Sequence, residues 1–182
     1  MRVHHHRSAE LHFELAFAAP PAALAGVVRQ YAGWIDQSTA PVCLRALPSG
    51  NIPLIIYFDG RVGDGDAFTA GLYDTATLVT SAGPAAGVQA DMTTLGARLL
   101  FDRPVADFRN QTVSLHDVLG PAAARLQQQL HDARTWDARF AVLNREIASR
   151  IHAAVPIRRE IEWTWTQLAR TSGRARVKCA WS

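Results

Sequence analysis

The stretch VCLRALPSGNIPLIIYFDG, residues 42–60, decides the fold class of this chain. Pro48, Ser49 and Gly50 separate two runs of strand-forming residues, which is typical of a turn between β-strands. The second run, Ile52–Phe58, is almost entirely apolar. A short apolar run bounded by turn residues indicates a strand that is buried on both faces. The sequence therefore predicts a β-rich region around residues 52–58.

More strands are predicted on both sides of this stretch. Residues 11–17 (LHFELAF) alternate apolar and polar side chains, with the period of a half-buried strand. The short runs 67–73, 76–81 and 86–92 are separated by Gly, Asp and Ser-Ala-Gly, which interrupt regular structure. Residues 21–34 differ, because their apolar side chains recur at helical spacing: Leu24, Val27, Val28 and Tyr31. We expect a helix there.

The pattern changes after Thr93, and from Pro121 onward it is helical. Thr93 or Thr94 can cap a helix over residues 93–101, and Thr135 can cap a later one. Pro121 suits a first helical position, and Pro156 ends the long helix before it. Apolar residues step by three and four along the predicted helices: Leu126 and Leu130; Phe140, Leu143, Ile147 and Ile151; Ile157, Ile161, Trp165 and Leu168, with Gly173 as the last stop.

The chain is therefore expected to be α+β, a small β-rich domain, for which a barrel is one of the expected forms, followed by a C-terminal helical segment. We divide it into an N-terminal strand with a frayed tail (1–18), a β-rich domain (19–120), a helical hairpin (121–155) and a last helix with its turn (156–182). Neither an internal repeat nor a low-complexity segment interrupts this division.

Composition and apolar patterning predict the cellular compartment of the protein. The 182 residues are 48% hydrophobic and 19% charged, as in an ordinary globular protein. No apolar run approaches the roughly 20 residues of a membrane span, and Glu10, His12 and Glu14 interrupt any apolar core of a signal peptide. Cys43 and Cys179 have no metal-type spacing and imply no disulfide framework. These features predict a cytoplasmic protein with no membrane contact.

Basic charge is concentrated at the end of the chain. Residues 1–138 carry 10 Lys/Arg against 13 Asp/Glu, whereas residues 139–182 carry 9 against 3. A polyanion would therefore meet the last quarter of the chain. All cations except Lys178 are arginines, which suits phosphate recognition and a GC-rich genome equally.

Catalytic motifs are missing from the sequence. The loop DGRVGDGDAF (59–68) has neither the spacing of a phosphate cradle nor that of a calcium loop, and it is expected to be a flexible turn. His4, His5 and His6 are consecutive and, with His12, form at best a weak metal tract, so a frayed terminus is the preferred interpretation. His116 and Asp117 form a possible acid–base pair, but Ser114 and Asp117 also fit a helix cap. We predict no enzyme, no cofactor and no metal site.

One motif resembles a known family. The pattern W-x-x-L-x-x-x-S-G-R-x-R-V, Trp165 to Val177, resembles the opening of the DNA-binding domain in AraC-type transcription regulators. The segments VVRQYAGWID, LPSGNIPLIIYF, FTAGLYD, GVQADMTTLGARLL and TVSLHDVLG are similar, in that order, to the N-terminal sensor region of one AraC branch. The resemblance spans roughly residues 19–177.

This resemblance implies a role in transcriptional control. Residues 19–120 would be the sensor, and residues 156–182 the first helix and turn of a helix-turn-helix domain that stops before its recognition helices. Arg174, Arg176 and Lys178 could contact DNA phosphates, but nothing there would read base edges. We therefore expect no sequence-specific DNA binding by this chain alone. The alternatives are a stand-alone ligand-binding or dimerisation module that forms mixed dimers with full-length relatives, and, less favoured, a small unrecognised enzyme.

The effector is not identified by the sequence, but candidate contacts are. Tyr57 in the apolar strand and Gln89 in GVQAD are candidate ligand-binding residues, with Trp34 as a candidate lid. Ordinary core packing remains the alternative for Tyr57 and Trp34. The apolar stripe of the last helix predicts a homodimer or larger oligomer through residues 157–172.

Overall fold

The computed structural model describes residues 1–7, 12–38, 42–59, 67–81 and 84–170. Its strands are β1 (Arg2–Arg7), β2 (His12–Ala18), β3 (Val28–Asp36), β4 (Val42–Ala46), β5 (Asn51–Asp59), β6 (Ala67–Ala70), β7 (Thr77–Ser81), β8 (Ala85–Thr93) and β9 (Thr112–Ser114). Its α-helices are α1 (Thr94–Phe101), α2 (Leu115–Leu119), α3 (Ala122–Asp132), α4 (Trp136–Ala153) and α5 (Arg159–Arg170). Short 3-10 helices occupy Ala22–Leu24 and Val105–Phe108. The expected α+β class is confirmed.

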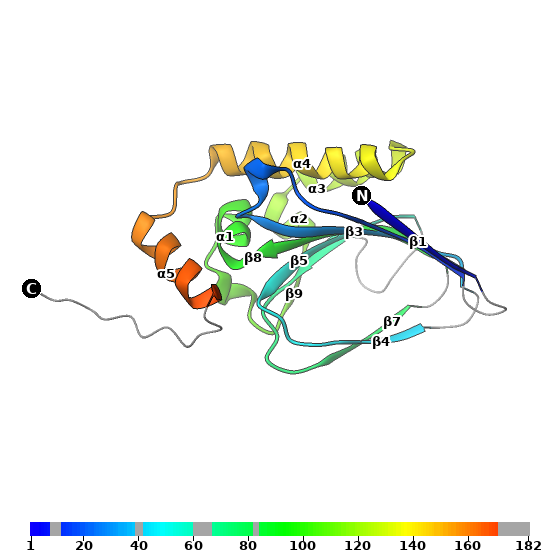
Figure 1. The fold of residues 1–182 in the computed structure, drawn as a ribbon, viewed down its shortest axis with the longest axis horizontal. Coiled ribbons are helices and arrows are strands. Elements are labelled where there is room, and N and C mark those ends of the chain that lie inside the picture. Colours follow the sequence, from blue (N-terminus) through cyan, green and yellow to red (C-terminus); the bar gives the residue numbers. More distant parts are fainter. Residues whose placement is uncertain (8–11, 39–41, 60–66, 82–83, 171–182) are drawn as a thin grey trace, which may run out of the picture.

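Seven strands form one antiparallel sheet in the order β1-β2-β3-β8-β5-β6-β9. In the described part of the chain β1 and β9 are its two edges, so the sheet stays open and does not close into a barrel. Strands β4 and β7 pair with each other as a separate two-stranded ribbon. Figure 1 shows α3 and α4 on one side of the sheet and the ribbon on the other. The two faces of the sheet therefore have different neighbours.

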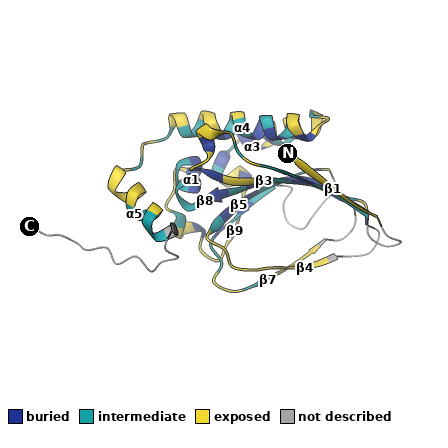
Figure 2. Cartoon of the chain, in the orientation of Figure 1, coloured by how far each residue is buried: buried dark blue, intermediate teal, exposed yellow. Residues whose placement is uncertain are grey.

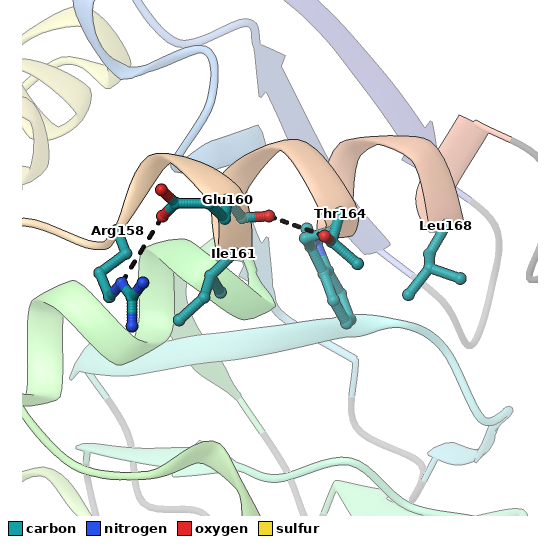
Figure 3. A pocket seen from close by; sticks show the side chains of 6 residues that line it. Arg158, Glu160, Ile161, Thr164 and Leu168 are labelled. Atoms are coloured by element: carbon teal, nitrogen blue, oxygen red, sulfur yellow. Dashed lines mark hydrogen bonds and ion pairs between the residues drawn. The ribbon is translucent and has the colours of Figure 1, made fainter. Parts of the chain in front are cut away.

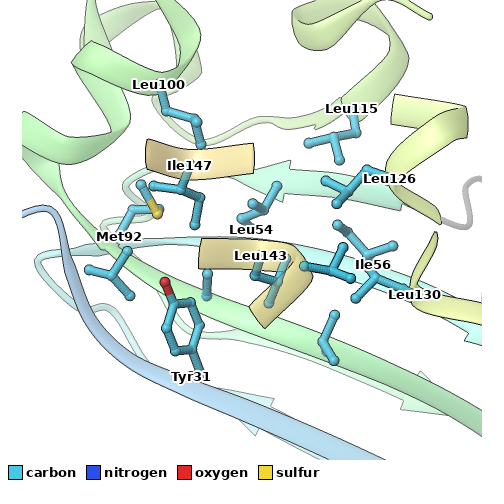
Figure 4. Packing of buried hydrophobic residues seen from close by; sticks show 14 of the residues in the cluster. Tyr31, Leu54, Ile56, Met92, Leu100, Leu115, Leu126, Leu130, Leu143 and Ile147 are labelled. Atoms are coloured by element: carbon cyan, nitrogen blue, oxygen red, sulfur yellow. The ribbon is translucent and has the colours of Figure 1, made fainter. Parts of the chain in front are cut away.

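The hydrophobic core lies between the sheet and the helices. Leu54 and Ile56 of β5 pack in one cluster with Leu130 of α3 and Leu143 of α4 (Figure 4). Burial of such a side chain stabilises the fold by about 1.5–3 kcal/mol. In Figure 2 the buried residues gather on the helices and on the strands beneath them, whereas the ribbon is mostly exposed. The helices and the sheet thus share one core.

Burial alternates along β5, which corrects one expectation. Ile52, Leu54 and Ile56 are buried, whereas Ile55 and Tyr57 between them are only half-buried. Successive side chains of a strand point to opposite faces, and the α-helices pack on only one face of this sheet. The prediction that β5 is buried on both faces is therefore wrong.

The helix expected over residues 21–34 is also wrong. A single 3-10 turn precedes β3, which pairs with β2 and β8. The register between β3 and β8 shifts between Val28 and Gln30. An extra residue at a β-bulge changes the side-chain alternation, so Val28 and Tyr31 are both fully buried although three residues apart. This spacing of three imitates a helical period.

Two further strand expectations need correction. β4 and β5 are strands, as predicted, but they do not form a hairpin, because β4 pairs with β7 and β5 pairs with β6 and β8. The histidine tract is not a frayed end, because Arg2–Arg7 pair with His12–Phe17 as strand β1. Backbone hydrogen bonds to β2 hold β1 in place although all its side chains are exposed.

The predicted helix caps are confirmed. The Thr93 side chain accepts a hydrogen bond from Gly96 N (2.9 Å), and the Thr135 side chain accepts one from Ala138 N (3.2 Å). Ser114 caps α2 in the same way, with His116 N as the donor at 3.2 Å. Pro121 lies directly before α3 rather than inside it. The last helix begins at Arg159, so Ile157 lies before it, and Gly173 lies outside the described residues.

An exposed polar cluster fixes the chain between β6 and β7 to the turn before β9. The Asp74 carboxylate accepts hydrogen bonds from Asn110 Nδ2 and Arg109 Nη2, both at 3.1 Å. These two hydrogen bonds hold the pKa of Asp74 below its usual value, and the bond from Asn110 has the larger effect. Tyr73 OH and Thr112 Oγ1 form a further hydrogen bond of 2.9 Å across the same junction.

None of the described helices combines the length and the apolar composition that a membrane-spanning helix requires.

Candidate functional site

The three candidate ligand-binding residues lie on one face of the sheet. Trp34 of β3 and Tyr57 of β5 both pair with Gly87 of β8, and Gln89 occupies the next position of β8 on the same face. Directly paired residues of antiparallel strands share a face. The opposite face carries Tyr31, which stacks on Phe140 of α4. Trp34, Tyr57 and Gln89 therefore lie on the face without helices, on the side of the β4–β7 ribbon (Figure 1).

We call this surface the aromatic face. Its members are half-buried and come from five adjacent strands: Leu15 and Phe17 of β2, Trp34 of β3, Gln89 of β8, Ile55 and Tyr57 of β5, and Phe68 of β6. The Trp34 and Tyr57 rings meet edge to face, with centroids 5.3 Å apart. The Tyr57 and Phe68 rings follow at 6.5 Å. Such distances are those of interacting aromatic pairs, so the rings form a continuous row.

Gly87 makes room for this row. A Cβ atom at Gly87 would overlap the Trp34 ring, with Cζ2 as the closest atom. The indole therefore lies against β8 and forms part of the floor of the aromatic face instead of a lid above it. Gly33 plays the same part on the opposite face, where a Cβ would overlap the Trp136 ring of α4.

Polar side chains of β8 form one end of the aromatic face. Gln89 Nε2 donates a 2.6 Å hydrogen bond to Asp91 Oδ1 two residues further on the same face. Partial burial raises the pKa of the Tyr57 hydroxyl, which indicates a surrounding of low polarity. The backbone carbonyl of Tyr57 accepts a 2.8 Å hydrogen bond from Gln127 Nε2 of α3. This bond fixes β5 to the helical layer.

A model of the DUF6597 family, described as a domain of unknown function, matches residues 16–114, more than half of the chain. The chain belongs to this family. No curated protein and no solved structure matches it significantly. The DUF6597 domain contains Trp34, Tyr57, Phe68 and Gln89, so the centre of the aromatic face lies within the family region.

Trp34 and Tyr57 pack against each other, outside the main hydrophobic cluster. The main hydrophobic cluster of the chain contains Tyr31 of β3 and Trp136 of α4, which lie on the helix side of the sheet. Trp34 and Tyr57 are not members of it. Sequence reasoning missed Phe68 and Asp91, which join the aromatic face through β6 and β8. Their signal is the alternation within AFTA and GVQAD, which has meaning only once the register is known.

A second apolar surface lies outside the family region, on α5. Ile161 is 53% exposed and Trp163 is 58% exposed. A groove of about 350 Å³ runs along the helix beside Ile161, Trp165 and Leu168. Figure 3 shows Ile161 and Leu168 pointing to the same side of α5. The predicted DNA-backbone residues Arg174, Arg176 and Lys178 lie outside the described residues.

A small pocket of about 170 Å³ lies at the helix side of β1–β3, beside His5, His12 and Glu14. Glu14 accepts a hydrogen bond from Trp136 Nε1, and its other oxygen is 3.3 Å from His5 Nδ1. His4 and His6 point to the other face, against Phe17 and Phe13. Among the described residues, no group of three or more His, Cys, Asp or Glu side chains is arranged to hold a metal ion.

Proposed function

We propose that the DUF6597 domain of this chain is the effector-sensing part of an AraC-type transcription regulator in the cytoplasm. In this proposal the aromatic face binds a small organic effector, with Trp34 and Tyr57 as apolar contacts and Gln89 as a polar contact. The protein acts by binding and not by catalysis. Arg174, Arg176 and Lys178 contribute weak, salt-sensitive contacts to DNA phosphates.

One observation carries this proposal. The sheet uses one face for its helices and core, and its other face presents a row of half-buried aromatic rings with an adjacent polar end. Small-molecule sites are mainly apolar and aromatic, with few fixed polar groups. The ordered sequence segments that resemble an AraC sensor include Trp34, Tyr57 and Gln89.

A second role is favoured by α5. Its exposed Ile161 and Trp163 and its apolar groove are features of an association surface. We propose that α5 contributes to a homodimer, or to a mixed dimer with a related chain. A stand-alone binding or dimerisation module would use the same two surfaces.

The ligand-binding proposal is tested with N-phenyl-1-naphthylamine, a neutral dye that fluoresces in apolar sites. The unmutated chain is expected to bind the dye, and Trp34→Ala is expected to bind it at least about tenfold more weakly, because about 1.4 kcal/mol of contact is lost. Trp163→Ala is the matched control, since Trp163 lies on α5 and is more than half exposed. Equal binding by the unmutated chain and Trp34→Ala would overturn the proposal. DNA binding is tested separately by footprinting at physiological salt, where no defined operator is expected to be protected by this chain alone.

A further inference from the structure

The aromatic face has a carboxylate at each end. Asp91 lies two residues from Gln89 on β8, and Asp36 lies two residues from Trp34 on β3, so alternation places both carboxylates on this face. Asp36 Oδ1 accepts a 2.8 Å hydrogen bond from Ser38 N. Asp91 Oδ1 accepts its bond from Gln89. The two acidic residues flank the rows of apolar and aromatic side chains.

No basic residue balances these charges at the centre of the face. In the described parts of β2, β5, β6 and β8, and in β3 from Gln30 onward, the register puts no Lys, Arg or His on the aromatic face. The basic residues that the register places on this face belong to β1, which β2 separates from Trp34. Arg29 is exposed in the bulge of β3, next to Gln30, which pairs with Asp91. Arg45 of the ribbon lies on the same side of the sheet, but it is exposed and pairs across to Leu78. The regularly paired positions around the aromatic rings in β2, β3, β5, β6 and β8 therefore carry two carboxylates and no cation.

Aromatic ring faces attract cations, most strongly where water is partly excluded. A carboxylate on the same face adds a second attraction for a cation and repels an anion. We propose that the aromatic face selects a planar organic cation, such as an aromatic ammonium or a ring-nitrogen cation. This inference rests on the proposed function, because it names the chemical class of ligand for the same site.

The raised pKa of Tyr57 supports the same picture. A tyrosine hydroxyl is neutral at neutral pH, and partial burial raises the pKa of Tyr57 further, so the side chain adds no negative charge beside Trp34. In a surrounding of low polarity an interaction between a charge and a ring is stronger than in water. The Asp91 carboxylate accepts hydrogen bonds and can bind several donors at once. Its bond to Gln89 therefore leaves acceptor capacity for a ligand.

The test compares three two-ring probes of nearly equal shape: the cation 1-methylquinolinium, neutral 1-methylnaphthalene and the anion 1-naphthoate. Titration calorimetry at low salt is expected to show the cation binding about tenfold more tightly than the neutral probe, and the anion more weakly than both. Asp91→Asn is expected to remove most of this preference without changing the affinity for 1-methylnaphthalene. Asp107→Asn is the matched control, because it removes the same charge from an exposed position of the Val105–Phe108 turn.

The outcomes separate this inference from the proposed function. Equal or tighter binding of 1-methylnaphthalene to the unmutated chain overturns the cation preference, whereas dye binding that depends on Trp34 would still support the sensor. A cation preference that is undiminished in Asp91→Asn, in a variant with unchanged circular dichroism, also overturns the inference. Binding of none of the probes contradicts both proposals. The three probes are compared on the unmutated chain, so the cation preference can be tested even if Asp91→Asn folds poorly.

Discussion

Removal of one hydroxyl group is expected to stabilise this protein. Tyr31 is fully buried in β3, and its OH has no hydrogen-bond partner among the described residues. In Figure 4 the oxygen of Tyr31 lies among apolar side chains. The ring stacks on Phe140 of α4 with centroids 5.7 Å apart, and phenylalanine would keep this contact. Tyr31→Phe therefore removes a buried polar atom and little else.

The magnitude follows from the state of that hydroxyl. A buried polar group without a partner costs about 1–3 kcal/mol in desolvation, and the small void left by the missing oxygen offsets part of the gain. We expect Tyr31→Phe to raise the free energy of unfolding by about 1–2 kcal/mol. For a domain of this size the melting temperature would rise by roughly 3–6 °C. Urea unfolding followed by circular dichroism measures the change, provided that the m-value is constant.

Alkaline pH gives an independent reading of the same group. Burial raises the pKa of Tyr31 above its ordinary value of about 10. Above pH 10 the unfolded chain loses this proton while the folded chain retains it, so the free energy of unfolding decreases as pH rises. Tyr31→Phe is expected to lose less stability than the unmutated chain between pH 9 and 11, an interval set by that ordinary value.

Tyr73→Phe is the matched control for this prediction, because the Tyr73 hydroxyl has a partner in Thr112 Oγ1 at 2.9 Å. This variant is expected to gain no stability, since it loses a hydrogen bond worth about 0.5–1.5 kcal/mol. A loss of more than about 1 kcal/mol in Tyr31→Phe would refute the reasoning, because it would require a bonded Tyr31 hydroxyl.

Three further outcomes are expected. Replacement of Ile161 by Glu together with Trp165 by Lys should shift the protein toward monomer and raise its solubility, and a monomer before and after in sedimentation velocity would contradict association through α5. Gly87→Ala should cost about 1–3 kcal/mol in urea unfolding and weaken dye binding, because the new Cβ overlaps the indole on β3; unchanged binding would count against the described floor of the face. The lowered pKa of Asp74 stabilises the folded chain above about pH 3.9, the ordinary pKa of Asp, and this stabilisation is lost as the pH falls below that value. Asp74→Asn should therefore flatten the acid limb of a curve of unfolding free energy against pH. An unchanged acid limb would contradict the role of Asp74.

The helix caps could be predicted because a cap is a local feature. Thr93 and Thr135 need only their own side chain and an amide three residues later. The strands β5 and β8 were predicted for a similar reason, since composition and punctuation lie within each segment. β3 was not, because its bulge places Val28 and Tyr31 on the same face at a spacing that also fits a helix.

The pairing of strands could not be predicted from local sequence. β4 and β5 are separated by a turn, yet backbone hydrogen bonds join them to different partners. β1 has no apolar face, and its order depends on its ladder with β2. The sequence named Trp34, Tyr57 and Gln89 separately, from their residue types. Only the register through Gly87 brings them to one face.

The same register explains why an apolar strand can supply a binding surface. The core contains three residues of β5: Ile52, Leu54 and Ile56. Because side chains alternate along a strand, Ile55 and Tyr57 point to the face without helices. Those side chains are only half-buried, so part of their apolar area still contacts water. A ligand that covers this area would gain about 25 cal/mol for each Å² removed from water. In the function that we propose, the apolar content that made β5 resemble a doubly buried strand would be the source of binding energy on the aromatic face, and the flanking carboxylates would set the preference among ligands.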